Sequence, residues 1–295
     1  MKGLANEGNT CYLNAALQCL VHVPGLTNYA LSGWADKDLA KKRINACALA
    51  REYLALTAAY WAPGQAASAG GVRAALAKLH KPFANDKPHD AHEALTLVLK
   101  HLHDALGRTP AIEPSYARAA VDLAAWDEHV RAEGYSILTE LCRGQVRCAV
   151  AGHGYESVTH EHFVGLTLEP APTLDAALEA YLAPVTIEDF EVRGAPATVV
   201  QTKTLVYAPL VLVVHLRRPS PPVECPLVWQ VPAAAGGGEY HLFAACLHAD
   251  GHYVAACEAG GVWRLMDDAA VTQLHEPPLD LLRRQATVLL YKKKL

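Results

Sequence analysis

The sequence predicts a protein of mixed class, in which helices and strands are segregated along the chain. Helical spacing of apolar residues dominates up to about residue 141 and is clearest at 11–21 and 96–106. After residue 141, short apolar or alternating runs are separated by turn residues, which is typical of strands. A continuous apolar run at 210–216 predicts one fully buried strand, and therefore a sheet covered on both faces.

Composition limits the kinds of protein that the chain can be. Its 295 residues are 52% hydrophobic and 19% charged, enough for a sizeable core in one large domain or two small ones. The formal net charge of -4 gives no reason to expect nucleic acid or an anionic membrane as a partner. No apolar run is long enough to cross a bilayer, and the residues before position 6 leave no room for a signal peptide.

The segment 3–20 contains the best candidate for chemistry. Cys11 follows a polar loop and opens a helical run that Pro24 and Gly25 are predicted to end. Backbone N–H groups in the first turn of a helix favour a thiolate and can also hold an oxyanion, to which Asn6 is placed to add a side-chain N–H. The alternative for a cysteine near a helix start is a small buried residue, and we assign Cys19 to that class.

The remaining helical segments of the first part are predicted at 40–60, 72–80, 96–106, 111–126 and 135–141. The helix at 96–106 is strongly amphipathic, and Pro88 is a plausible first-turn residue for it. Asp90 and Glu93 are expected in that first turn, where carboxylates interact favourably with the helix dipole. Capping is therefore the structural interpretation of both residues.

Strands are predicted at 155–168, 186–201, 210–216, 240–248, 252–257, 262–266 and 285–291. A tight turn at 249–251 separates the strand that ends at His248 from the strand that begins at His252. Asp267 and Asp268 follow directly after the next strand. This order places a histidine and two carboxylates at the ends of neighbouring strands.

Three strings of residues resemble one enzyme family. Residues 3–20 fit GLxNxGNTCYxNxxLQxL and closely resemble the cysteine box of the ubiquitin-specific proteases. The segment around Asp90 resembles the second box of that family, and the strings H-x-x-GHY and W-x-x-x-DD-x-x-V between His248 and Val271 resemble its histidine box. The resemblance runs from residue 3 to residue 291. It implies an α+β, papain-like cysteine protease in one domain, 1–295, with a helical thumb (about 1–141), fingers (about 142–205) and a palm (about 206–295).

A cysteine protease needs a base near the thiol and a third group that fixes the tautomer of the imidazole. A hydrogen bond between His252 and Asp267 would leave the other ring nitrogen facing Cys11. His248 is the nearest rival, but the glycine before His252 and the tyrosine after it favour His252. Asp267 is the preferred orienting carboxylate, because it directly follows the strand, and Asp268 is a possible helper.

The resemblance also implies a substrate-binding surface. In the family, the acidic residue that corresponds to Asp90 typically binds the basic tail of ubiquitin. The other residues expected to bind substrate are Gln18, Glu93, His248, Gly251 and Tyr253. Pro88 and His89 replace the usual glutamines of the second box, so that match is partial. The turn between the two histidines is short for a blocking loop, which would leave the tail channel less gated.

Family members usually hold a zinc ion in the fingers through two C-x-x-C pairs. This chain keeps Cys148 of the first pair and has Gly-Ala-Pro-Ala at 194–197, near where the second pair should fall. The remaining candidate ligands are Cys142, Cys148, His153, His160 and His162, and their spacing fits no common zinc pattern. We therefore expect no metal and no other cofactor. The eight cysteines also show no regular disulfide spacing, which favours a reducing, intracellular setting.

The reaction implied by the resemblance is hydrolysis of the bond after the last glycine of ubiquitin. Cys11 would attack the carbonyl, His252 would protonate the leaving amine and then activate water, and Asn6 with the amide of Cys11 would stabilise the oxyanion. Two alternatives remain: a protease for another ubiquitin-like modifier, and a non-catalytic ubiquitin-binding module. The expected partner is ubiquitin or a ubiquitin-conjugated protein, and the protein is expected to be a monomer.

Overall fold

The computed structural model describes residues 1–39, 47–64, 66–107, 123–217, 221–233 and 237–295. Its helices are α1 (Cys11–Leu20), α2 (Pro24–Leu31), α3 (Trp34–Leu39), α4 (Ala48–Trp61), α5 (Gly70–Leu79), the 3-10 helix η2 (Lys81–Ala84), α6 (Ala91–Ala105), α7 (Leu123–Glu133), α8 (Ile137–Cys142), α9 (Leu174–Leu182) and α10 (Leu279–Gln285). Helices dominate up to residue 142 and strands dominate after it, so the predicted mixed class is confirmed.

The strands are β1 (Leu4–Ala5), β2 (Ala67–Ser68), β3 (Gly144–Gly152), β4 (Tyr155–Phe163), β5 (Gly165–Leu168), β6 (Val185–Val192), β7 (Ala195–Tyr207), β8 (Val211–Leu216), β9 (Val228–Val231), β10 (Gly238–Ala249), β11 (His252–Ala259), β12 (Val262–Asp267), β13 (Ala270–Gln273) and β14 (Ala286–Lys293). They form a small parallel pair, β1 with β2, and two larger sheets. The larger sheets position the site, and each is described below.

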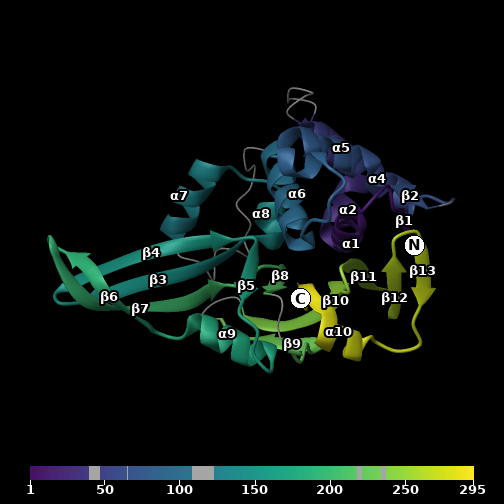
Figure 1. Ribbon diagram of the computed structural model, residues 1–295. Coiled ribbons are helices and arrows are strands. Elements are labelled where there is room, and N and C mark those ends of the chain that lie inside the picture. The colour runs from purple at the N-terminus through teal and green to yellow at the C-terminus, as the bar shows by residue number, and fades with distance from the viewer. Residues whose placement is uncertain (40–46, 65, 108–122, 218–220, 234–236) are drawn as a thin grey trace.

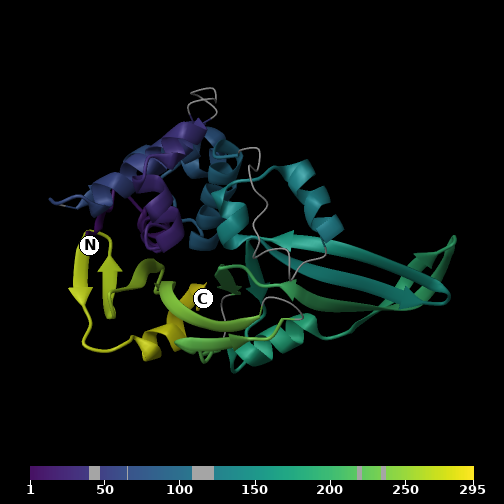
Figure 2. The same cartoon turned by 180° about the vertical axis from the view of Figure 1, so that it is seen from behind.

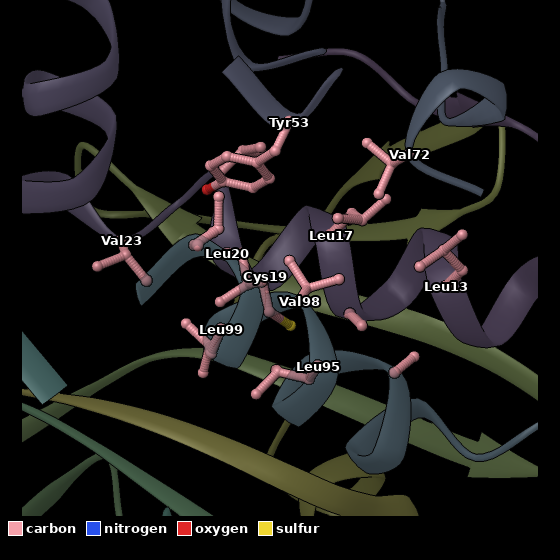
Figure 3. Close-up of a cluster of buried hydrophobic side chains, with 14 of the residues drawn as sticks. Leu13, Leu17, Cys19, Leu20, Val23, Tyr53, Val72, Leu95, Val98 and Leu99 are labelled. Atoms are coloured by element: carbon pink, nitrogen blue, oxygen red, sulfur yellow. The ribbon is translucent and has the colours of Figure 1, made fainter. Parts of the chain in front are cut away.

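The first helix, α1, lies at the centre of the helical part, and all of its residues are buried. It packs against α6 on one side and against β11 on the other. Figure 3 shows the contact with α6, where leucines of both helices interdigitate around Cys19; the labelled side chains include Leu13, Leu17, Leu20, Leu95, Val98 and Leu99. A helix that is apolar all round is stable when it is enclosed by other elements, and this enclosure fixes the position of its N-terminus.

The eight-stranded sheet has the order β13-β12-β11-β10-β14-β8-β5, with β9 paired to β10. Its strands are antiparallel except for the parallel pair of β5 and β8. Strand β8 is almost completely buried, which confirms the prediction from the apolar run 210–216. The helices α1 and α6 lie over one face of this sheet, and α9 and α10 lie on the other side (Figure 1).

The four-stranded sheet, β4-β3-β7-β6, extends away from the helical part (Figure 2). The segment 186–201 was predicted to be one strand, and this prediction is wrong because the chain reverses within it. Val192 pairs with Ala195, so Arg193 and Gly194 form a two-residue turn with φ of 52° and 83°. Positive φ at both positions is the geometry of a tight hairpin turn, and glycine accepts it without strain.

Helix α6 begins at Ala91, which is earlier than the predicted start at residue 96. Pro88 therefore lies outside the helix, and the expectation that it belongs to the first turn is wrong. Asp90 is the N-cap, where Oδ1 accepts hydrogen bonds from the backbone N–H groups of His92 and Glu93 at 2.7 Å and 3.0 Å. The cap satisfies the first helical amides, and this explains why the helix starts there.

Several other segments differ from the sequence prediction. The helix expected at 40–60 is seen as α4, and residues 40–46 lie outside the described residues. Most of the helix expected at 111–126 also lies outside them, and α7 begins at 123. The short elements α3, β13 and α10 were not predicted. No helix in the described part of the chain combines the length and the apolar character needed to cross a membrane.

Candidate active site

The loop before α1 sets the direction from which Cys11 is reached. Oδ1 of Asn6 accepts hydrogen bonds from the backbone N–H of Gly8 at 3.0 Å and of Thr10 at 3.3 Å. Gly8 and Asn9 have φ of 98° and 50°, so the loop turns sharply in the left-handed region. The side chain of Asn6 thus holds the loop closed from inside, and Cys11 becomes the first residue of α1.

Cys11 lies at the end of α1 where backbone N–H groups have no helical partner. Within the described residues, Thr10 makes no side-chain cap and the first turn contains no acidic side chain. The positive end of the helix dipole is therefore not neutralised locally, and it favours an anion at this position. Cys11 is 7% exposed, so its sulfur is approached through a narrow opening.

His252 and Asp267 are neighbours at the end of two paired strands. Asp250 and Gly251 make a two-residue turn with φ of 50° and 77°, and His252 is the first residue of β11 after it. Nε2 of His252 lies 2.7 Å from Oδ1 of Asp267, the last residue of β12. Because a carboxylate only accepts hydrogen bonds, Nε2 carries the proton of the neutral ring, and Nδ1 is left as the basic nitrogen. The two side chains are 43% and 56% exposed.

Asp268 joins this strand end to the loop and helix of Cys11. Its Oδ2 accepts a hydrogen bond from Nδ2 of Asn6 at 2.8 Å, and its Oδ1 accepts one from Nδ2 of Asn14 at 2.8 Å. Its backbone oxygen accepts from the N–H of Leu4 at 2.8 Å and from Nε2 of Gln18 at 3.3 Å. These four bonds connect α1 and the N-terminal segment to the turn that follows Asp267. Together with the packing of α1 on β11, they bring the candidate nucleophile and the His252–Asp267 pair to one joint.

The N-terminal segment approaches that turn very closely at Gly3. A Cβ atom at this position would lie 2.2 Å from the backbone oxygen of Ala269, which is closer than side-chain atoms come to backbone. Only glycine fits here without displacement of one of the two segments. The N-terminus accordingly runs beside β12 and β13 in both views (Figures 1 and 2).

Three of the residues predicted to bind substrate are brought together beside this joint. The hydroxyl of Tyr253 donates a hydrogen bond to Oδ2 of Asp90 at 3.3 Å, and the ring of His248 stacks on Tyr253 at 4.2 Å. Burial raises the pKa of Tyr253 well above its ordinary value, so the phenol stays protonated as a donor. Asp90 therefore uses one oxygen to cap α6 and the other to contact β11, while its side chain remains exposed.

The other three predicted substrate-binding residues have different environments. Gly251 lies in the turn before His252, and Glu93 is exposed on the first turn of α6. Gln18 is completely buried, and its described contact is with the backbone of Asp268. A side chain with 0% exposure does not reach a protein substrate, so the expectation for Gln18 is corrected: it supports the Asp268 turn.

Metal ligands are sparse in the described residues. His252, Asp267 and Asp268 place one donor atom each within 4.8 Å of one another, but these atoms already have hydrogen-bond partners in His252, Asn6 and Asn14. Of the finger candidates, His162 stacks on His129 at 4.0 Å and bonds to Gln145. Burial raises the pKa of both Cys142 and Cys148, which disfavours the thiolate form that zinc requires.

Asn14 is the residue of this joint to which the sequence analysis assigned no role. It is 1% exposed, and its Nδ2 reaches the backbone oxygens of Leu4 and Ala5 as well as Asp268. Its place in the N-terminal string, on the same helical face as Cys11, was the signal that marked it. A buried amide among apolar neighbours calls for a polar partner, and here that partner comes from the other end of the chain.

The same sequence was compared with known families. The profile of the family described as "Ubiquitin carboxyl-terminal hydrolase" matches residues 2–291. The chain belongs to this family. Its similarity to ubiquitin carboxyl-terminal hydrolase 10 of Arabidopsis thaliana is 31% identity over 191 residues, or 60% of this chain and 20% of that protein. Ubiquitin carboxyl-terminal hydrolase 17 of Homo sapiens is 29% identical over 99% of this chain and 56% of its own length. The chain thus spans from about a fifth to about half the length of these curated relatives.

Solved structures agree with the fold of this hydrolase-family chain. The SAGA Ubp8/Sgf11/Sus1/Sgf73 DUB module bound to ubiquitin aldehyde contains a chain that matches with a TM-score of 0.75 at 17% identity. That match covers 100% of this chain and 70% of the other. The same module bound to monoubiquitin matches with a TM-score of 0.77 at 18% identity. The α+β architecture predicted from the sequence is therefore confirmed for the chain as a whole.

Proposed function

We propose that this chain is a thiol-dependent ubiquitinyl hydrolase that cleaves the peptide or isopeptide bond after the C-terminal glycine of ubiquitin. The family membership and the names of the relatives support this proposal. The observation that carries it is the joint at Asp268, which ties the helix of Cys11 to the strand end that bears His252 and Asp267. A nucleophile, a base and an orienting carboxylate are the minimum set for this chemistry.

In the proposed reaction, Sγ of Cys11 attacks the carbonyl carbon of the last glycine. Nδ1 of His252 holds the proton of the thiol and transfers it to the leaving amine as the carbon–nitrogen bond breaks. Water then attacks the thioester, giving a proton to Nδ1, and the thiolate of Cys11 leaves. Throughout both steps Asp267 holds Nε2 of the ring, and this keeps Nδ1 turned to the reacting atoms.

The oxyanion would be held by the backbone N–H of Cys11 and by the side chain of Asn6. Nδ2 of Asn6 has two hydrogens, and one of them is donated to Asp268. The carboxamide is also held through Oδ1 by the backbone of the loop, so its second N–H has a fixed direction. Loss of one preorganised donor of this kind typically lowers kcat by about 10² to 10³.

The ubiquitin tail would enter past Asp90, Glu93, His248, Gly251 and Tyr253. The exposed carboxylates on α6 attract a basic tail, and the Tyr253–Asp90 bond fixes one wall of the entrance. We propose a single catalytic domain, 1–295, that works as a monomer, with thumb, finger and palm parts bounded near residues 141 and 205. An intracellular setting is supported by the eight cysteines, all of which are free thiols.

Release of a fluorophore from a ubiquitin C-terminal amide tests the proposal. Cys11→Ala should abolish turnover, whereas Cys225→Ala, another nearly buried cysteine far from the joint, should retain it. Full activity in Cys11→Ala would refute the proposal. If a ubiquitin-derived electrophile fails to label Cys11 while ubiquitin still binds, the chain is instead a non-catalytic binding module.

A second candidate is a protease for another ubiquitin-like modifier. One observation favours it: residues 194–197, where a zinc-binding cysteine pair would fall, form the β6–β7 turn and the start of β7. The finger sheet would therefore meet the globular part of a modifier with an altered surface. Side-by-side labelling with ubiquitin, SUMO and NEDD8 electrophiles separates the two candidates, because the correct modifier should label Cys11 fastest.

A further inference from the structure

A cavity of about 410 Å³ lies at the far end of α1 from Cys11. The last turn of α1, helix α2, the end of α4 and the β11–β12 turn enclose it. These elements meet above the sheet in Figure 1. The ten residues of α1 separate it from the candidate active site by about 15 Å. Its volume falls within the range of pockets that bind small molecules.

One wall of the cavity is His22, which is 5% exposed. Nδ1 of this ring lies 2.6 Å from the backbone oxygen of Gln18, and because a carbonyl only accepts, Nδ1 must carry the hydrogen. Burial lowers the pKa of His22 to about 4, so the ring is neutral near pH 7. Nε2 is then a buried acceptor, and it has no hydrogen-bond partner within the described residues.

The rest of the lining defines the complementary ligand. Trp61 is held in place by a hydrogen bond from Nε1 to the backbone oxygen of Val21 at 3.1 Å, and its ring lies edge-on to His22. Phe243 extends the apolar wall from β10. Glu258 and Lys292 lie at the rim 3.5 Å apart, so their charges compensate each other. A cavity with apolar walls, a neutralised rim and one unpaired acceptor favours an uncharged ligand with one donor.

We propose that this cavity binds a neutral aromatic ring that carries one N–H or O–H group, which donates a hydrogen bond to Nε2 of His22 while the ring packs against Trp61 and Phe243. This binding site is separate from the proposed hydrolase reaction and uses none of its residues. The ligand chemistry is shared by two sources, a free small molecule and the side chain of a tryptophan in a peptide.

Indole and indene test the proposal by NMR on the whole chain. Indole should bind saturably and move the ring-nitrogen resonance of His22 Nε2 to lower frequency, as an accepted hydrogen bond does. Indene has the same bicyclic shape without the N–H group, and it should bind about tenfold more weakly or worse, because it leaves the acceptor unpaired. Equal binding of indole and indene, or no shift at His22, would overturn the proposal. So would an Nε2 resonance that is already at the hydrogen-bonded position in the free protein, since water would then fill the site.

Two variants link the binding to the cavity. His22→Phe keeps an aromatic ring and removes the acceptor, so indole should lose its preference over indene. Since His22→Phe also removes the bond to Gln18, Leu31→Trp provides a second test: Leu31 lines the mouth, is 49% exposed, and a larger side chain there should block entry. Leu79→Trp, at a leucine that is 48% exposed outside the cavity, is the matched control and should bind indole normally.

N-acetyltryptophanamide distinguishes the two sources. If it binds as tightly as indole, the mouth accepts a ring attached to a peptide backbone, and the natural ligand is a tryptophan side chain. If only indole binds, the site takes a free small molecule. Activity with a ubiquitin amide plays no part in either measurement, so failure here and failure of the proposed hydrolase function are separate results.

Discussion

Replacing Asp267 by asparagine tests the triad most directly. The carboxylate of Asp267 accepts the proton on Nε2 of His252, and this leaves Nδ1 as the base. A carboxamide can donate as well as accept, and when its NH₂ group faces Nε2 the proton moves to Nδ1. The base toward Cys11 is then blocked. In serine proteases the equivalent change lowers kcat by about 10⁴.

The expected loss here is smaller, because the pair is more exposed. The two side chains are 43% and 56% exposed, so an asparagine is free to rotate and present its oxygen to Nε2 in part of the population. We expect kcat/KM to fall about 100-fold, which corresponds to about 2.7 kcal/mol. Stability should hardly change, because exposed ion pairs contribute about 0–1 kcal/mol.

Asp268→Asn is the matched control, since it makes the same change at the next residue. Asp268 has φ of 50°, which asparagine tolerates, but its carboxylate accepts from Asn6 and from the buried Asn14. An amide cannot accept both bonds as well. We expect a loss of about 2 kcal/mol of stability, or roughly 3 to 5 °C in Tm.

The assay is hydrolysis of a fluorogenic ubiquitin amide alongside thermal unfolding of both variants. Asp267→Asn should lose activity with an unchanged Tm, and Asp268→Asn should lower the Tm. If Asp267→Asn retains more than half of the wild-type kcat/KM while Asp268→Asn loses about 100-fold at unchanged Tm, the assignment of the orienting carboxylate is wrong.

Three further perturbations follow from the structure. Gly3→Ala should lower both Tm and kcat, because its Cβ would lie 2.2 Å from the backbone oxygen of Ala269; a Tm within about 1 °C of the wild type would contradict this. Asp90→Ala should cost about 1 kcal/mol in urea unfolding through loss of the α6 cap, whereas Asp90→Asn should keep the cap and raise only KM for ubiquitin. The pKa of His22 is about 4 in the folded chain and higher when it is unfolded, so the unfolded state binds the extra proton below about pH 6.5. Stability should therefore fall as pH drops from about 6.5 to about 4, with about 1.4 kcal/mol per pH unit from this residue, and His22→Phe should flatten that slope.

Much of the fold was readable from local patterns. The helix that begins at Cys11, the buried strand β8, and the three strands on either side of Gly251 all follow from periodicity and turn residues. The failures have physical causes. The start of α6 is set by a hydrogen-bonded cap rather than by apolar spacing, and the β6–β7 hairpin is set by backbone dihedral angles at two residues.

The pairing of His252 with Asp267 was predicted correctly from strand ends, because antiparallel neighbours bring the start of one strand to the end of the next. The position of Asp268 was not predictable in this way. Its partners, Asn6 and Asn14, lie in a loop and a helix far away in sequence, and no local pattern specifies such a contact. The same limit applies to Gln18, whose polar side chain gave no sign of complete burial.

The hydrogen bond between Asn6 and Asp268 joins residues that are 262 positions apart. On the ribosome, the thiol is therefore made long before the imidazole and carboxylate that would activate it. A nascent chain carries an incomplete centre until the segment around residue 268 has emerged and folded back onto the first few residues. Cotranslational exposure of a working nucleophile is avoided by the order of assembly alone.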